Sequence, residues 1–136
     1  MNTYEFIDLQ KAPNPRLLLR EETQQIIGFA FDVLNEVGHG LREKIYENSL
    51  VVLFKENDIS FDQQQRFPVH FHQGEVGEFV PDLVVFGAVT VDPKVIDAIT
   101  DHERGQMLNY LRITKLRVGL ILNFKHARLE WERVVL

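Results

Sequence analysis

The spacing of apolar residues changes along the chain, from helical in the first part to alternating in the second. Between Thr23 and Val37 the apolar positions follow a helical period, which predicts a helix over about residues 23–37 that ends at Gly38. A second stripe predicts another helix over about residues 41–57. Residues 1–20 show no clear period and contain Pro-Asn-Pro, so we expect an irregular N-terminal arm there.

The shorter period of β-strands begins after the second predicted helix. Alternation over residues 67–71, a turn at Gln73-Gly74 and a nearly continuous apolar run from Glu78 to Phe86 predict a hairpin that leads into a buried strand. A further helix is expected over about residues 103–113, with strands over about 88–97, 116–124 and 128–135. The order of helices, three strands, a helix and two strands predicts an α/β (α+β) sandwich around a mixed sheet.

Length and composition limit the classes of protein that fit this pattern. The chain has 136 residues, 45% of them apolar, which suits a single domain over residues 21–136. The sequence contains no cysteine, which excludes a disulfide framework and a thiolate metal site and fits a reducing compartment. No apolar stretch reaches the ~20 residues that cross a bilayer, and the Leu17–Leu19 run is too short for a signal peptide. We therefore expect a cytoplasmic protein that does not span a membrane.

The overall charge is acidic, with 15 Lys and Arg against 20 Asp and Glu and a net charge of -5. A domain that grips nucleic acid by its phosphates usually carries a basic surface, so this balance argues against a stand-alone DNA-binding protein. It argues less against a nuclease, because an active site built from carboxylates is itself acidic until a metal ion binds.

Several polar residues stand where the apolar pattern predicts burial. Asp82 interrupts the predicted buried strand, where it is either a structural aspartate or part of a site. Asp92 and Lys94 share one face of the next strand, with Pro93 between them. An ion pair within a sheet and a divalent-metal site both fit these residues. Two crowded carboxylates repel each other unless a cation neutralises them, so the cluster as a whole favours a metal site.

Two helices contribute further candidates. Glu43 shares a predicted inward face with Tyr46, which makes it a candidate for the site. With Gly40 as N-cap it would be the third helical residue, so capping of the helix is the alternative. Gln106 and Tyr110 lie one turn apart on the helix that follows Lys94, which is a weak signal by itself.

Together these residues resemble a known family. Residues 40–46 read as a GxxExxY motif, Pro81-Asp82 followed by Asp92-Pro93-Lys94 reads as a PD-(D/E)XK signature, and residues 106–110 read as QxxxY. From Thr23 to Val135 the chain thus resembles the GxxExxY group of the PD-(D/E)XK nuclease superfamily. The resemblance implies a restriction-endonuclease-like core, in which a central mixed sheet is flanked by helices.

The resemblance also implies a cofactor and roles for the candidate residues. The cofactor would be Mg²⁺ or Mn²⁺, hard cations that prefer oxygen ligands. The metal ligands would be Asp82, Asp92, the carbonyl of Pro93 and, directly or through water, Glu43. Lys94 would position the attacking water or stabilise the transition state. Gln106 and Tyr110 would orient Lys94 or contact the phosphate.

The sequence departs from the family pattern at Asp92-Pro93-Lys94, where the family has Glu, an aliphatic residue and Lys. Aspartate is one methylene shorter than glutamate. Proline removes a hydrogen-bond donor from the strand, so we expect it at a sheet edge or a bulge and not within a regular central strand. Its carbonyl remains available to a metal ion, and a bulge at Pro93 would also aim its neighbours towards the cleft.

Three functional hypotheses follow. The first is a metal-dependent nuclease that hydrolyses phosphodiester bonds in DNA, or less readily in RNA. The second is a catalytically impaired nuclease-fold protein that serves as a nucleic-acid-binding or assembly module, for example as a homodimer built with the arm. The third is a nucleolytic subunit that depends on a helicase-type partner to hold DNA, which would account for the lack of a basic groove.

Overall fold

The computed structural model describes residue 14 and residues 17–136. The helices are α2 (Arg20–Val37), α3 (Glu43–Glu56) and α4 (Asp101–Thr114). The strands are β1 (Phe61–Gln63), β2 (Phe67–Phe71), β3 (Gly74–Phe79), β4 (Leu83–Val85), β5 (Val89–Lys94), β6 (Val118–Asn123) and β7 (Glu130–Val135). The expected irregular arm falls mostly on residues 1–13 and 15–16, which lie outside the described residues. Within the described part, no helix is long and apolar enough to cross a membrane.

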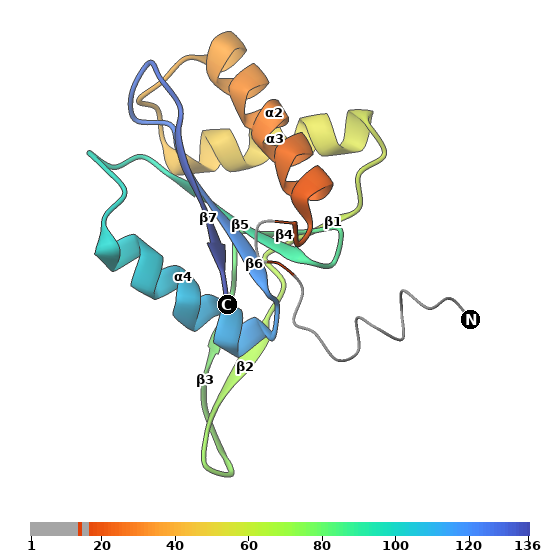
Figure 1. Ribbon diagram of the computed structural model, residues 1–136, viewed down its shortest axis with the longest axis vertical. Coiled ribbons are helices and arrows are strands. Elements are labelled where there is room, and N and C mark those ends of the chain that lie inside the picture. The colour runs from red at the N-terminus through yellow and green to blue at the C-terminus, as the bar shows by residue number, and fades with distance from the viewer. Residues whose placement is uncertain (1–13, 15–16) are drawn as a thin grey trace.

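The strands form a mixed five-stranded sheet and a separate two-stranded ribbon. The sheet has the order β1-β4-β5-β6-β7, with β5 and β6 parallel and the other neighbours antiparallel. The ribbon pairs β2 with β3 and projects from the body of the molecule (Figure 1). The predicted α/β fold with a central mixed sheet is confirmed.

Helices cover both faces of the sheet, so the molecule has three layers (Figure 1). The larger core lies between the sheet and the α2–α3 pair and includes Ile26, Leu50 and Phe54. A smaller core under α4 includes Met107 and Leu111. Along β6 the side chains alternate between the two cores, with Leu120 and Leu122 in the larger core and Ile121 in the smaller one, as expected for a sheet buried on both faces.

The apolar run from Glu78 to Phe86 is not the single strand that its pattern predicted. β3 ends at Phe79 in the ribbon, and β4 begins at Leu83 in the main sheet, with residues 80–82 connecting them. Pro81 has no N–H to donate to a ladder, which favours a break at this point. With the short β1, five strands instead of the expected three precede α4. Continuous hydrophobicity indicates burial but does not tell which sheet a segment joins.

Pro93 lies within β5, the central strand, contrary to the expectation of an edge or a bulge. The β5–β6 register advances one residue at a time, so there is no bulge. The proline is tolerated because pairing with β4 stops at Val91, which leaves no β4 partner opposite its missing N–H. Lys94 O accepts from Phe124 N at 2.8 Å on the β6 side. Since successive residues of a strand direct their polar groups to alternate sides, the Pro93 carbonyl points to the vacated β4 side.

Candidate active site

Most of the residues singled out in the sequence surround one small hollow of about 150 Å³. It lies where β5, the β3–β4 connection, the start of α3 and α4 meet, and its walls include Glu43, Asp82, Asp92, Lys94 and Tyr110. Gln106 is placed elsewhere, in a separate hollow with His102 and Asn109. The structure therefore brings five of the seven candidate side chains together and separates Gln106 from them, while Pro93 adjoins the hollow through the strand.

Asp92 and Lys94 form the only charged pair that β5 contributes to the described structure. Their side chains share one face of the strand, and Lys94 Nζ lies 3.3 Å from Asp92 Oδ2. The side chain of Lys94 is 20% exposed and that of Asp92 is 17% exposed. Burial raises the pKa of Asp92 to about 6, with Lys94 opposing the shift and Asp82 adding to it. Burial also works against the charge of Lys94, but attraction from Asp92, Glu43 and Tyr110 outweighs it and raises the lysine pKa.

Asp82 lies in the connection just before β4, so it is positioned by the end of a strand and not by a strand face as predicted. Its Oδ1 accepts a long hydrogen bond of 3.5 Å from Gln64 Nε2, and its carbonyl accepts from Gln64 N at 3.2 Å. Burial and the nearby Glu47 raise the pKa of Asp82, while Gln64 and Lys44 oppose the rise. Both aspartates of the site are thus held in surroundings that disfavour their negative charge.

Glu47 is a buried carboxylate beneath the site that the sequence interpretation missed. It is 3% exposed, and its Oε2 accepts hydrogen bonds from Lys44 Nζ at 2.9 Å, Gln63 Nε2 at 2.5 Å and Gln64 Nε2 at 3.2 Å. Because Gln64 also contacts Asp82, this network ties α3 to the β3–β4 connection. The helical period carried a signal for Glu47, which lies one turn before the buried Leu50.

The segment that reads as GxxExxY forms the turn into α3. Gly40 has a positive φ of 78°, which favours glycine, and its N–H donates to Phe124 O at 2.9 Å. The buried Tyr46 donates its hydroxyl to Gly38 O at 2.7 Å and accepts from Leu41 N at 3.0 Å, and its ring stacks on Phe124. The glycine and the tyrosine therefore fix the turn that carries Glu43.

Glu43 itself is placed differently from the prediction. The N-cap is Arg42 and not Gly40, so Glu43 is the first helical residue instead of the third. It is exposed and not turned into the core, yet it lines the hollow. The turn at Gly40 delays the helix by two residues, which carries the carboxylate from the packed face to the mouth of the site.

On the other wall, Tyr110 is held by an aromatic contact with the ribbon. Its ring stacks on Phe79 with centroids 4.0 Å apart and planes 14° from parallel. Burial raises the pKa of Tyr110, and Asp92 adds to the rise while Lys94 opposes it. The hydroxyl therefore keeps its proton at neutral pH and is available as a hydrogen-bond donor.

The carboxylate oxygens at the hollow are the type of ligand that a hard divalent cation prefers. Two carboxylates with raised pKa values face one hollow, a third lies at its mouth, and a bound cation would offset their repulsion. Within the described ranges, no three His, Cys, Asp or Glu side chains are gathered closely enough to hold a metal ion by themselves. The remaining ligands would come from the main chain and water, which Mg²⁺ accepts readily.

Comparison with known proteins gives two similarities. A family model described as the PD-(D/E)XK nuclease superfamily matches residues 20–134. The crystal structure of SSO0001 is similar with a TM-score of 0.54 at 12% sequence identity. That similarity covers 88% of this chain and 60% of the other, and at such low identity it shows a shared fold alone. No curated protein matches the sequence significantly.

Proposed function

The chain belongs to the PD-(D/E)XK nuclease superfamily, and we propose that it is a metal-dependent nuclease that hydrolyses phosphodiester bonds in DNA. The observation that carries this proposal is the convergence of Asp82, Asp92 and Lys94 on one hollow, with the lysine paired to the second aspartate. We propose further that it belongs to the GxxExxY group, because Gly40 and Tyr46 build the turn that presents Glu43.

Each residue has a proposed role in holding the cofactor, which we take to be Mg²⁺ or Mn²⁺. Asp82, Asp92 and the Pro93 carbonyl would be the ligands, and Glu43 would act directly or through a water. When bound, the cation supplies Lewis-acid polarisation of the phosphate and lowers the pKa of a water molecule. The pairing of Lys94 with Asp92 holds this carboxylate at the hollow, where it would be available to a cation.

The remaining side chains would act on the phosphate and the attacking water. Lys94 keeps its positive charge at neutral pH, since its pKa is raised, and would position the water or stabilise charge that develops on the phosphate oxygens. Tyr110 would orient Lys94 by accepting a hydrogen bond from its ammonium group, or would donate from its own hydroxyl to the phosphate. Gln106 does not line the hollow that holds Lys94, which favours a contact with the phosphate over a role in orienting the lysine.

The experiment that tests this function joins metal binding with cleavage. Mg²⁺ and Mn²⁺ are titrated by calorimetry into the wild type and Asp82→Ala, and both proteins are assayed on single- and double-stranded DNA and on RNA. Metal binding and cleavage that are both lost in the variant support the proposal. Asp62→Ala, an exposed aspartate on β1, is the matched control and should behave as the wild type.

One observation favours the second candidate, a nuclease-fold module without catalysis. Asp92 is shorter than the family's glutamate, and Lys94 already supplies a positive charge beside it without a metal ion. If neither the wild type nor the variant binds metal, with or without DNA, the module becomes the better account. Assembly with a second copy or a helicase-type partner stays a prediction.

A further inference from the structure

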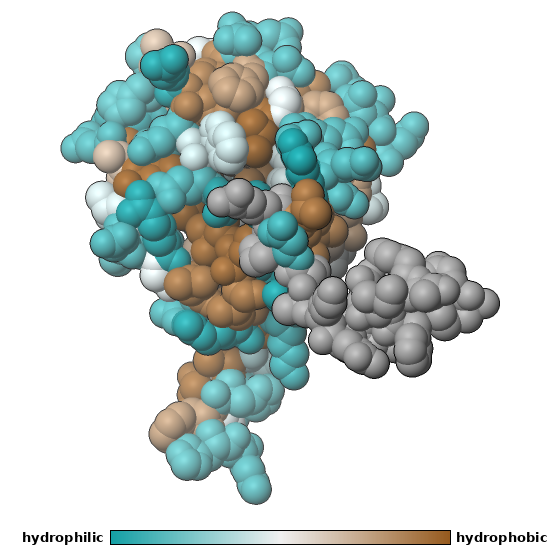
Figure 2. Space-filling view, in the orientation of Figure 1, coloured by the Kyte–Doolittle hydropathy of each residue, from teal (hydrophilic) through white to brown (hydrophobic). Residues whose placement is uncertain are grey.

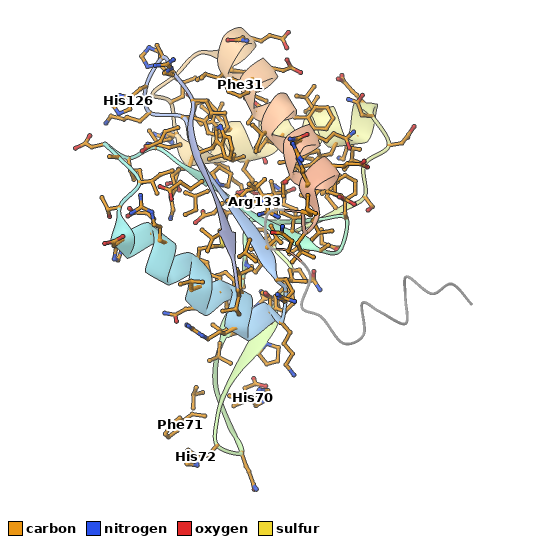
Figure 3. The ribbon with its side chains drawn as sticks, viewed as in Figure 1. Phe31, His70, Phe71, His72, His126 and Arg133 are labelled. Carbon is orange, nitrogen blue, oxygen red and sulfur yellow. The ribbon has the colours of Figure 1, made fainter. Side chains whose placement is uncertain are left out.

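A groove of about 590 Å³ separates the base of the β2–β3 ribbon from the end of α4. It is lined by Phe67, Pro68, Val69 and His70 from the ribbon and by Arg112, Ile113, Thr114 and Lys115 from the helix end. The ribbon wall is largely apolar, and the helix wall carries the cations. Figure 3 places His70 on the ribbon, closer to the body than Phe71 and His72 near the tip.

The charge of the groove is opposite to that of the chain as a whole. Arg112 and Lys115 are both exposed, and no carboxylate is among the lining residues, although the net charge of the protein is -5. Two carboxylates of β3 lie opposite the ribbon wall of the groove: Glu78, opposite Pro68, is paired with Arg66, and Glu75, opposite His70, does not line the groove. The groove is therefore an electropositive region beside an acidic site, which suits a polyanion.

The two cations are also placed so that they can contact a ligand. Arg112 donates through Nη1 to Asn109 Oδ1 at 2.8 Å, which orients the guanidinium and leaves further N–H groups for another acceptor. Lys115 is the C-cap of α4, with φ 62°. The negative end of the helix dipole accounts for a cation in the last turn, but not for a groove that an apolar strand closes on the other side.

The groove adjoins the candidate active site across a single pair of ribbon residues. Phe67 and Phe79 are directly opposite each other in the ribbon, and directly paired residues project to the same face. Phe67 lines the groove, whereas Phe79 lines the hollow that holds Asp92 and stacks on Tyr110. A polymer that lies in the groove would thus continue past this aromatic pair into the site.

We propose that this groove binds the sugar-phosphate backbone of the nucleic acid beside the bond that is cleaved, with Arg112 and Lys115 contacting phosphates. The inference rests on the proposed function and adds a surface that holds the substrate, on a chain whose net charge is -5. The apolar ribbon wall suits sugars and bases, which present little charge. Beyond the groove, apolar residues also reach the surface along the ribbon (Figure 2), where Phe71 is 67% and Val76 is 64% exposed.

Binding is measured by fluorescence anisotropy with a labelled oligonucleotide, as a single strand and as a duplex, in EDTA over a series of salt concentrations. The test variant is Arg112→Gln with Lys115→Gln. Each lost phosphate contact should lower the slope of log affinity against log salt by about 1. The strand form whose slope falls is the form that the groove holds.

The control variant, Arg20→Gln with Lys55→Gln, removes the same charge from exposed positions on the opposite layer and should leave the slope unchanged. Arg112→Lys with Lys115→Arg keeps both charges and should retain binding. Circular dichroism checks that each variant is folded.

Two results would contradict the proposal that the groove binds nucleic acid: an unchanged slope in the test variant, or no binding of either oligonucleotide by the wild type. Cleavage assayed in parallel with Mn²⁺ keeps the two proposals separate. A wild type that cleaves while the test variant binds normally refutes the groove and leaves the nuclease. A wild type that binds with the expected slopes but does not cleave refutes the nuclease and leaves the groove.

Discussion

The two faces of β5 differ completely in character although they alternate along six residues. Val89 and Val91 are fully buried in the apolar core under α2 and α3. Asp92 and Lys94, on the other face, line a hollow in which two aspartates have raised pKa values. One face contributes burial that stabilises the fold, and the other holds charges at a cost to stability. Substitutions on the two faces should therefore separate stability from activity.

The largest expected effect is on the polar face. Asp82→Asn keeps the size of the side chain but removes a proposed metal ligand, so cleavage should fall by at least about 10²–10³-fold, the loss typical of a deleted electrostatic contact. The same change relieves repulsion with Asp92, so the unfolding free energy of the metal-free protein should rise. Cleavage kinetics and urea denaturation measure the two quantities. A variant that is less stable and equally active would contradict the comparison.

The apolar face should respond in the opposite way. Leu120, next to Val91 on β6, is fully buried in the larger core, and Leu120→Ala should lower the unfolding free energy by about 2–5 kcal/mol. Activity per folded molecule should stay close to that of the wild type below the melting transition. Chemical denaturation gives the stability, and cleavage at low temperature gives the activity. A large loss of activity in fully folded protein would show that the two faces are coupled.

Tyr46 contributes to both stability and the candidate active site, because it belongs to the core and also fixes the turn that carries Glu43. Tyr46→Phe keeps the stack on Phe124 but removes the hydroxyl that serves Gly38 O and Leu41 N. The loss of these two hydrogen bonds should lower the unfolding free energy by about 1–3 kcal/mol. Glu43 would then be held less firmly, so Mn²⁺ binding should weaken. Denaturation and calorimetry test both effects. Normal Mn²⁺ affinity in the variant would show that Glu43 does not depend on this turn.

The sequence predicts the helices and β2 well because each has a regular apolar period, and α2 has a clear end at Gly38. The second strand of the ribbon, β3, has no such period, and the apolar run that was expected to form one strand from Glu78 is divided between β3 and β4. The sequence also singles out the residues that meet at the hollow, since carboxylates within apolar runs are conspicuous. The role of Glu47 was missed because its partner Gln63 comes from β1, a strand too short to show a period. The outcome at Pro93 likewise depends on where β4 stops pairing, which no local pattern records.

The smallest expected effect concerns pH. The pKa of Asp92 rises from 3.8 in the unfolded chain to about 6 in the folded protein, so the folded state holds its proton more tightly. Its contribution to stability is therefore full below about pH 4 and is lost as the pH rises through about 6. In metal-free buffer the unfolding free energy of the wild type should decrease across this window, and less so for Asp92→Asn.

Metal binding should follow the same titration with the opposite sign. The cation needs the ionised carboxylate, so Mn²⁺ affinity should increase as the pH rises towards and through about 6 and level off above it. Saturating Mn²⁺ should then raise the melting temperature of the wild type more at pH 7.5 than at pH 5, while Asp82→Asn should show little change at either pH. Equal stabilisation at both pH values would mean that the cation binds away from Asp92, and the polar face of β5 would lose its assigned function.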